Sequence, residues 1–238
     1  MKCLIVAAGQ GVRLREKGQL KPLIEIKGVP LIERVIDRAR RGGVDEFWVV
    51  SGYRGDELRM ELDAFAARKD LRIEHIVNES WDRANGISVL KAKPYLNEPF
   101  LLTMCDHLLD PEIFRSLMSV PVEPDTVTLA VDFNIDRPLN DLEDVTRVKC
   151  SGGLIHHIGK VIRDFNALDT GLFLCTPAIF DALEESQANG DDSISGAMNV
   201  LARRNKARTF DIQDRVWIDV DDPAAFGKAE NLLETGLL

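Results

Sequence analysis

The first apolar run of the chain leads directly into a turn that contains two glycines. Ala7-Ala8-Gly9-Gln10-Gly11 follows the run that begins at Cys3, and Arg13 comes two residues after the second glycine. Glycines in a turn after a strand let backbone N–H groups approach phosphate oxygens without obstruction by a side chain. The arrangement favours a phosphate-binding loop, to which Arg13 adds a fixed positive charge, and the alternative is an ordinary structural turn.

Two common phosphate-binding motifs do not fit this loop. The dinucleotide fingerprint needs a third glycine where this chain has Leu14, and it needs a helix to begin at once. Instead, the segment from Arg13 to Gln19 is charged and lacks helical periodicity. A P-loop is excluded because the chain contains no Gly-Lys-Ser/Thr. A nicotinamide-dependent dehydrogenase is therefore disfavoured.

The elements that must position this loop alternate between strand and helix in the first half of the chain. We expect strands at 2–7, 46–51, 72–77 and 100–105, with helices at 30–41 and 56–68 between them. Such alternation predicts a mostly parallel, doubly wound sheet. Beyond about residue 120 we expect strands at 126–132, 145–149, 154–158, 171–175 and 208–212, and helices at 177–185, 193–204 and from Pro223. Without a linker or repeat, the chain is expected to form one α/β domain over 1–238.

Composition sets limits on the function. The chain has 238 residues, of which 45% are hydrophobic and 29% charged, so it can bury a sizeable core. Its net charge of −9 argues against nucleic acids and anionic membrane surfaces as partners. The first thirty residues carry no targeting signal, and no stretch approaches the ~20 apolar residues that span a bilayer. The four cysteines are scattered, so we expect a reduced, cytoplasmic protein without direct membrane insertion.

Motifs along almost the whole chain resemble those of the nucleotidyltransferase superfamily. Gly9 to Leu14 matches G-x-G-x-R-L, and it is followed by Lys21-Pro22-Leu23 and by Gly28-Val29-Pro30. Further matches are Asn78-Glu79, Asn85-Gly86, Ser88, Met104-Cys105-Asp106-His107 and Trp217-Ile218-Asp219-Val220-Asp221. The chain is most similar to the cytidylyltransferases that make CDP-inositol from CTP and inositol 1-phosphate. The resemblance implies a Rossmann-like mixed sheet, with a nucleotide-binding half over about 1–120 and an acceptor-binding half over about 121–238.

The reaction that this resemblance implies accounts for the cationic residues. An acceptor phosphate attacks the α-phosphorus of a nucleoside triphosphate in line, and pyrophosphate leaves, so catalysis consists mainly of positioning and electrostatic stabilisation. The amides of Gly9 to Arg13 and the Arg13 guanidinium suit the leaving phosphates. Lys21, a compact point charge, suits the α-phosphate, and the alternative is a solvated loop lysine.

Acidic residues at two strand ends suggest a magnesium site. Asp106 stands at the carboxyl end of an apolar strand, where ligands bind in open α/β sheets. Mg²⁺ takes one or two carboxylates together with substrate phosphates. The second carboxylate is expected from Asp219 or Asp221, although Asp221 could instead cap the last helix. His107 has no partner at metal-ligand spacing, so we expect it to orient Asp106.

The resemblance also assigns residues to the two substrates. Base and ribose contacts are expected from Asn78, Asn85, Gly86 and Ser88, with Ala7 and Ala8 forming the opposite wall. The alternative for Asn85-Gly86 is an ordinary turn before a helix. Contacts to the acceptor phosphate and its hydroxyls are expected from Lys149, Lys160, Asn166, Asp169 and Thr170. The choice of CTP over UTP rests on the resemblance alone.

Several alternatives remain open for the acceptor and for the activity. Phosphocholine would need an aromatic cage, and the aromatic content of only 6% mildly favours a polyol phosphate. A sugar 1-phosphate is a further candidate acceptor. A nucleotide-binding regulator without turnover is disfavoured because it would not need Arg13, Lys21 and Asp106 together. In the resembling group the enzyme can be fused to a lipid-forming membrane domain, so a membrane-bound CDP-alcohol transferase is an expected downstream partner.

Overall fold

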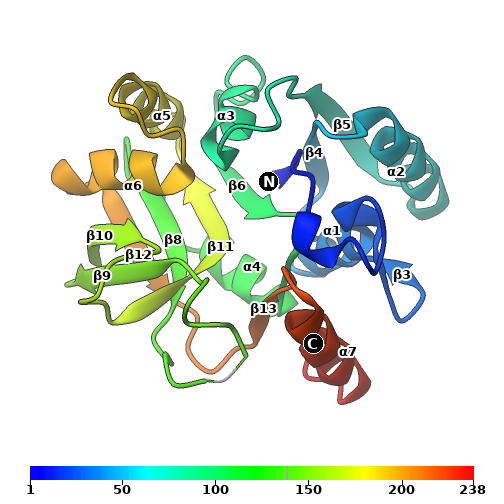
Figure 1. Ribbon diagram of the computed structural model, residues 1–238. Coiled ribbons are helices and arrows are strands. Elements are labelled where there is room, and N and C mark those ends of the chain that lie inside the picture. The colour runs from blue at the N-terminus through cyan, green and yellow to red at the C-terminus, as the bar shows by residue number, and fades with distance from the viewer. Residues whose placement is uncertain (138) are drawn as a thin grey trace.

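A nine-stranded mixed sheet forms the centre of the molecule in a computed structural model that describes residues 1–137 and 139–238 (Figure 1). The strand order across the sheet is β5-β4-β1-β6-β11-β8-β12-β10-β9. In chain order the strands are β1 (Lys2–Ala7), β4 (Glu46–Ser51), β5 (Arg72–Val77), β6 (Phe100–Met104), β8 (Val127–Asp132), β9 (Arg147–Ser151), β10 (Leu154–Gly159), β11 (Ala167–Cys175) and β12 (Ala207–Asp211). The sequence-based expectation of an α/β fold with a Rossmann-like mixed sheet is confirmed.

The two halves of the sheet differ in strand direction. Strands β5, β4, β1 and β6 are all parallel, as expected from the alternation of strands and helices. Strand β11 runs antiparallel to β6 and β8, and β10 runs antiparallel to β9 and β12. Strands β9 and β10 are joined through Gly152 and Gly153, both with positive φ, which is typical of a tight hairpin turn. The parallel arrangement predicted from the alternation in the first half is therefore confirmed there. In the second half only β12 and β8 pair in parallel among the described strands, which gives the expected mixed sheet.

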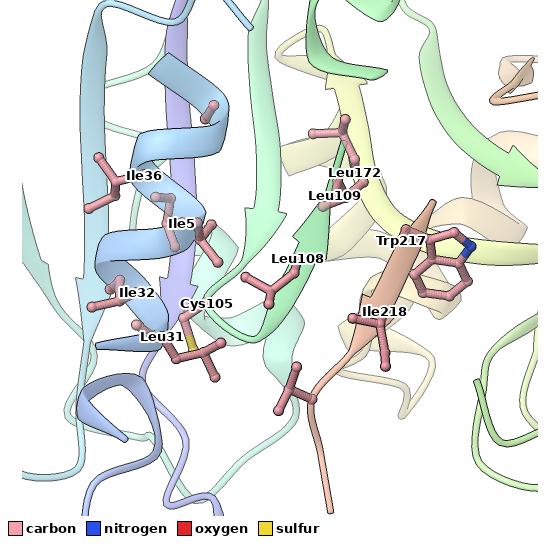
Figure 2. Close-up of a cluster of buried hydrophobic side chains, with 14 of the residues drawn as sticks. Ile5, Leu31, Ile32, Ile36, Cys105, Leu108, Leu109, Leu172, Trp217 and Ile218 are labelled. Carbon is pink, nitrogen blue, oxygen red and sulfur yellow. The ribbon is translucent and has the colours of Figure 1, made fainter. Parts of the chain in front are cut away.

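Helices cover both faces of the sheet. Leu4 and Val6 of β1 belong to one buried cluster, and Cys3, Ile5 and Ala7 belong to the other. Because successive side chains of a strand point to opposite faces, the two clusters lie on opposite faces of the sheet. On the Ile5 face, shown in Figure 2, the helices are α1 (Leu31–Arg41), α2 (Gly55–Lys69), α4 (Pro111–Met118) and α7 (Pro223–Glu234). On the Leu4 face they are α3 (Asn85–Leu90), α5 (Ala178–Ala188) and α6 (Ile194–Arg203).

Two small ladders lie beside the main sheet, and one of them joins segments that are distant in the sequence. Strand β7 (His107–Leu109) pairs antiparallel with β13 (Trp217–Asp219), which places Asp219 opposite His107. Strand β2 (Glu25–Ile26) pairs with β3 (Val29–Pro30), next to the single 3₁₀ turns η1 (Val12–Leu14) and η2 (Lys21–Leu23).

No helix among the described residues is long and apolar enough to cross a membrane.

A buried hydrogen bond fixes β13 against the main sheet. The Trp217 side chain is fully buried, and its Nε1–H donates to Asp132 Oδ2 over 2.9 Å. The other carboxylate oxygen of Asp132 accepts the Asn134 amide, so this buried acid has partners on both sides. The position of β13, and with it the position of Asp219, therefore depends on a polar contact inside the core.

We expect Trp217→Phe to lower the free energy of unfolding by about 1–3 kcal/mol, because it leaves a buried carboxylate oxygen without its donor. The space left by the smaller ring adds to this cost. Urea unfolding measures the change. Trp48→Phe is the matched control: Trp48 is only partly buried, and its indole bonds a side chain of its own strand, Glu46. Equal effects of the two substitutions would contradict the structural role of the Asp132 contact.

Candidate active site

A cavity of about 520 Å³ lies where the loop after β1 meets the ends of β6 and β13 and the face of β11. Residues from both halves of the chain line it. Eleven of the residues expected to bind substrate, act in catalysis or hold the metal are among them, as is His107: Ala7, Gly9, Gly11, Arg13, Lys21, Asn85, Asp106, Lys160, Asp169, Asp219 and Asp221. The carboxyl ends of β1 and β6 meet at this edge, which is where ligands bind in open α/β sheets.

The two glycines of the loop after β1 have different structural roles. Gly11 has a φ of 62°, and a Cβ built there would lie 2.3 Å from the Lys21 Cβ. A Cβ at Gly9 would meet no atom within 4 Å. Gly11 therefore allows the loop to pack over Lys21, while the backbone at Gly9 stays open towards the cavity.

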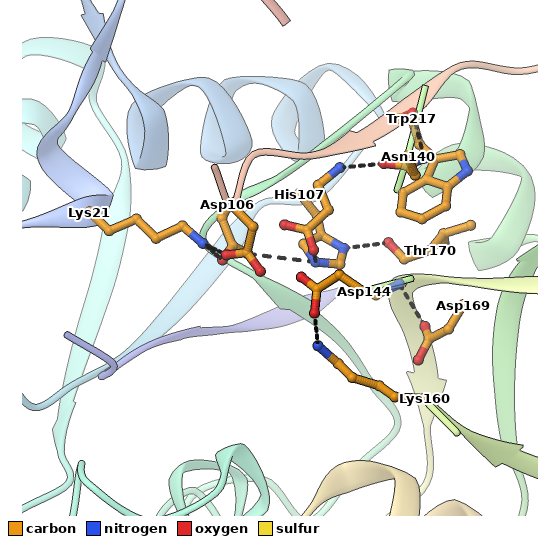
Figure 3. Close-up of polar contacts among 12 residues, drawn as sticks. Lys21, Asp106, His107, Asn140, Asp144, Lys160, Asp169, Thr170 and Trp217 are labelled. Atoms are coloured by element: carbon orange, nitrogen blue, oxygen red, sulfur yellow. Dashed lines mark hydrogen bonds and ion pairs between the residues drawn. The ribbon is translucent and has the colours of Figure 1, made fainter. Parts of the chain in front are cut away.

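Lys21 is buried at the centre of the site. It is 6% exposed, and its ammonium pairs with Asp106 Oδ2 and Asp221 Oδ1 (Figure 3). Burial alone would lower the pKa of Lys21, but the charges of Asp106 and Asp221 outweigh burial and raise it. In the same pair, burial acts to raise the pKa of Asp106, and the Lys21 charge lowers it below its usual value. The alternative that Lys21 is a solvated loop lysine is wrong.

Asp106, His107 and Asp219 form a compact cluster beside Lys21. His107 Nε2 lies 3.7 Å from Asp106 Oδ1 and 3.5 Å from Asp219 Oδ2, and its Nδ1 bonds the Thr170 carbonyl over 2.8 Å. Burial acts to lower the pKa of His107, but the neighbouring carboxylates, Asp219 above all, raise it to about 10. The histidine thus lies between two acids, both at metal-ligand spacing from it, so the expectation that His107 has no partner at such spacing is wrong.

This cluster has the composition of a cation site. One atom from each of Asp106, His107 and Asp219 lies within 4.8 Å of the others. Among the described residues, Asp106 Oδ1 and Asp219 Oδ1 are buried and accept no hydrogen bond. A buried carboxylate oxygen without a donor is costly, so a bound cation would offset that cost. Asp221 lies next to the cluster, and the cap of α7 is Asp222, whose Oδ1 accepts the Ala225 amide. The alternative that Asp221 caps the last helix is therefore wrong.

Arg13 joins this centre to the second half of the chain. Its guanidinium pairs with Asp221 and with Asp144, and Lys160 Nζ lies 2.7 Å from the same Asp144 carboxylate. Burial acts to raise the pKa of Asp144, but its bonds to Lys160 and Arg13 lower it. Asp144 is missing from the sequence-based assignment, because only its contacts distinguish it from the other acids at 141–144.

The residues predicted to contact the nucleotide are divided between the cavity and the layer behind it. Asn85 lines the cavity, and its Oδ1 accepts the Ile194 amide. Asn78 and Ser88 are buried and bonded to each other over 2.9 Å. A Cβ at Gly86 would lie 2.3 Å from the Asp192 carbonyl, so this glycine is needed for packing and does not face a base. Ala8, expected with Ala7 to form the opposite wall, is buried and is not among the described residues that line the cavity. Asn85-Gly86 begins helix α3 and is not a turn before it.

The residues predicted to contact the acceptor are also divided. Lys160 and Asp169 line the cavity, and burial raises the pKa of Asp169 to about 6. The hydroxyl of Thr170 is buried and donates to the Ala130 carbonyl. Asn166 bonds both backbone groups of Cys150, and Lys149 pairs with Asp164. Thr170, Asn166 and Lys149 are not among the described residues that line the cavity. Their direct contact with the acceptor stays a prediction.

Sequence reasoning also missed an apolar wall and a glycine contact. Val6, Met104 and Phe173 line the cavity beside the charged residues, and only the register of β1, β6 and β11 brings them together. A Cβ at Gly171, whose φ is 74°, would lie 2.2 Å from His107 Nδ1. The glycine thus makes room for the histidine at an irregularity in β11.

Comparisons with known proteins find relatives that match almost the whole of this chain. A curated protein of Rubrobacter xylanophilus named "Bifunctional IPC transferase and DIPP synthase" is 36% identical over 234 residues, which are 96% of this chain and 51% of that protein. The chain therefore spans about half the length of such relatives. A UTP–glucose-1-phosphate uridylyltransferase of Streptococcus pyogenes is 26% identical, with 90% of this chain and 84% of that protein covered.

Solved structures share the fold. The inositol-1-phosphate CTP transferase from T. maritima superposes with a TM-score of 0.87 at 23% identity, covering 98% of this chain and 94% of that chain. At this identity the likeness establishes the fold alone. The family model of the MobA-like NTP transferase domain matches residues 3–206, which include the loop after β1, Lys21 and Asp106. The chain belongs to the family of MobA-like NTP transferase domains.

Proposed function

We propose that this protein transfers a cytidylyl group from CTP to inositol 1-phosphate, releasing pyrophosphate. The observation that carries the proposal is the convergence of Arg13, Lys21 and Lys160 with carboxylates in one cavity lined by both halves of the chain. Cations held at the edge of a sheet beside an open glycine loop suit a triphosphate that meets a phosphate ester. The relative named for IPC transfer supports the choice of acceptor.

Cytidylyl transfer requires stabilisation of negative charge and little proton transfer. An oxygen of the acceptor phosphate attacks the α-phosphorus, and the bond from that phosphorus to the bridging oxygen of the β-phosphate breaks. Lys21, oriented by Asp106 and Asp221, offsets the charge that develops on the α-phosphoryl oxygens. Arg13 and the open amides around Gly9 hold the departing pyrophosphate. Because the attacking phosphate is already anionic, no general base is required.

Magnesium fits the residues present. Asp106, Asp219 and Asp221 would hold the ion, since two of these acids have buried oxygens without a hydrogen-bond donor and Mg²⁺ prefers carboxylate ligands. Bound Mg²⁺ would supply positive charge for the triphosphate and the leaving pyrophosphate. The protein's own cations are already matched with carboxylates, which is why an added cation is needed.

The two substrates are assigned to opposite sides of the cavity. The cytosine base lies against Val6, Ala7 and Met104, and the side chain of Asn85 reads its polar edge. Asn78 and Ser88 lie in the layer behind the cavity, where their hydrogen bond supports α3. On the other side, Lys160 takes the acceptor phosphate and Asp169 takes ring hydroxyls. The product, an activated CDP-alcohol, suits consumption by a membrane-bound CDP-alcohol transferase.

A sugar 1-phosphate is the second candidate acceptor, because a relative covered over 84% of its length is named for glucose 1-phosphate. Phosphocholine is less suited to the cavity. Phe173 is the one Phe, Tyr or Trp ring among the described lining residues, whereas a quaternary ammonium favours a cage of several rings.

A pyrophosphate-release assay tests the function. We expect release with CTP, inositol 1-phosphate and Mg²⁺, and loss of release when a chelator removes the metal. Crossing CTP, UTP, GTP and ATP with inositol 1-phosphate, phosphocholine and glucose 1-phosphate separates the candidates. Release with glucose 1-phosphate alone would overturn the acceptor assignment, and no release from any combination would overturn the activity.

Lys21→Ala should lower kcat by about 10²–10³-fold, the usual effect of removing one positioned charge-stabilising group. It also leaves Asp106 and Asp221 without their shared cation, so Mg²⁺ should raise the melting temperature of this variant more than that of the unaltered protein. Lys27→Ala is the control, because Lys27 forms an exposed pair with Glu234 and is not among the described residues that line the cavity. Turnover near the unaltered value in Lys21→Ala would remove Lys21 from the catalytic step.

The two loop glycines supply a matched pair of variants. Gly11→Ala should destabilise the fold and lower kcat, because its methyl group collides with Lys21 and its φ is positive. Gly9→Ala should leave the free energy of unfolding unchanged within about 0.5 kcal/mol. Its added methyl group should nevertheless raise the Kd for CTP, because phosphates must approach this backbone. Unfolding and nucleotide titration measure both effects, and unaltered CTP affinity in Gly9→Ala would argue against a phosphate-binding loop.

A further inference from the structure

One carboxylate bridges the cations that the proposed function assigns to different substrates. Asp144 Oδ1 lies 2.7 Å from Lys160 Nζ (Figure 3). Its Oδ2 pairs with the Arg13 guanidinium. Arg13 comes from the loop after β1 and Lys160 from the residue after β10, so the bridge crosses the cavity from one half of the chain to the other.

The backbone around Asp144 is held firmly. Arg147 donates to the Leu142 carbonyl over 2.6 Å and to the Ile162 carbonyl over 3.1 Å, which ties the segment of Asp144 to the segment of Lys160. Asn140 accepts the Asp219 amide over 2.9 Å, which ties the same segment to β13. The Asp144 side chain itself is 33% exposed, so its carboxylate can turn towards solvent without moving this backbone.

Asp144 continues a row of alternating charges across the site. From Asp106 the row passes to Lys21, Asp221, Arg13, Asp144 and Lys160. Asp106 belongs to the cluster with metal-ligand spacing and Asp221 pairs with the same Lys21 ammonium as Asp106, whereas Asp144 neither belongs to that cluster nor pairs with Lys21. A metal ion can therefore bind Asp106 and Asp221 in place of Lys21. Asp144, by contrast, is replaced by a phosphate that binds Arg13 or Lys160.

We propose that Asp144 is a positioning residue that couples the two substrate sites. Its carboxylate holds Arg13 and Lys160 together, and a phosphate that binds Arg13 displaces it by competition and by repulsion between like charges. Lys160 then loses its counter-ion and becomes available to the acceptor phosphate. The inference rests on the proposed function for the identity of the two ligands. It requires only that both cations bind phosphoryl groups.

Pyrophosphate, titrated calorimetrically with Mg²⁺ present, tests the displacement without any turnover. Asp144→Asn should bind pyrophosphate about 3- to 10-fold more tightly than the unaltered protein, since the competing ion pairs are partly exposed and individually weak. Glu143→Gln, the matched control, removes the same charge from the adjacent residue and should change the affinity less than about 2-fold. Equal or weaker pyrophosphate binding by Asp144→Asn would overturn the proposal.

Coupling is measured by titrating inositol 1-phosphate with and without saturating pyrophosphate. The unaltered protein should bind the acceptor several-fold more tightly with pyrophosphate present, Asp144→Asn should lose this gain, and Asp144→Glu should retain part of it. An equal gain in Asp144→Asn would overturn the coupling. If inositol 1-phosphate binds none of the variants, the proposed acceptor is wrong, and the pyrophosphate comparison still decides the role of Asp144.

Discussion

The buried ammonium of Lys21 is the constraint on which the rest of this structure depends. A charge with 6% exposure is tolerated only beside opposite charges, and here they come from Asp106 after β6 and Asp221 after β13. The Val220 amide donates to the Asp106 carbonyl, so the two acids approach Lys21 together. Residues 200 positions apart in the sequence must therefore meet at one point, and the pairing of β7 with β13 brings them there.

The ion pairs already present in the site determine how it binds a triphosphate. Because Arg13, Lys21 and Lys160 already have carboxylate partners, the cavity offers no surplus of positive charge to a triphosphate. Binding becomes an exchange of partners, in which phosphates replace carboxylates and a divalent cation takes the acids that are released. Such a site holds its groups in place before the substrate arrives, which lowers the reorganisation that the reaction requires.

Strands with strong patterns were predictable from the sequence, and so were the residues at their ends. The bounds of β1, β4 and β5 agree with the prediction, because β1 and β4 are largely apolar and β5 mixes apolar with polar residues in a short segment rich in Ile and Val. Asp106 and Asp221 follow the ends of β6 and β13, whereas Arg13 and Lys21 lie in 3₁₀ turns and were predicted from the motifs of the resembling family. The direction of a side chain is set by tertiary packing, which is why Asn78 and Ser88 bond each other behind the cavity. Asp144 lies in a loop whose course depends on long-range ties such as that of Arg147, so sequence pattern does not single it out.

Strand β11 explains how one sheet can serve two substrates. It pairs with β6 of the parallel half and with β8 of the antiparallel half, and its irregularity between Asp169 and Phe173 turns residues towards the cavity. At that irregularity the Thr170 carbonyl accepts from His107, and Gly171 gives the imidazole the space to approach. The stretch from Asp169 to Phe173 thus positions His107 between two acids and also places Asp169 on the acceptor side. The geometry of the candidate cation site and that of the acceptor wall are therefore set by one stretch of backbone, and a change in either one would be transmitted to the other.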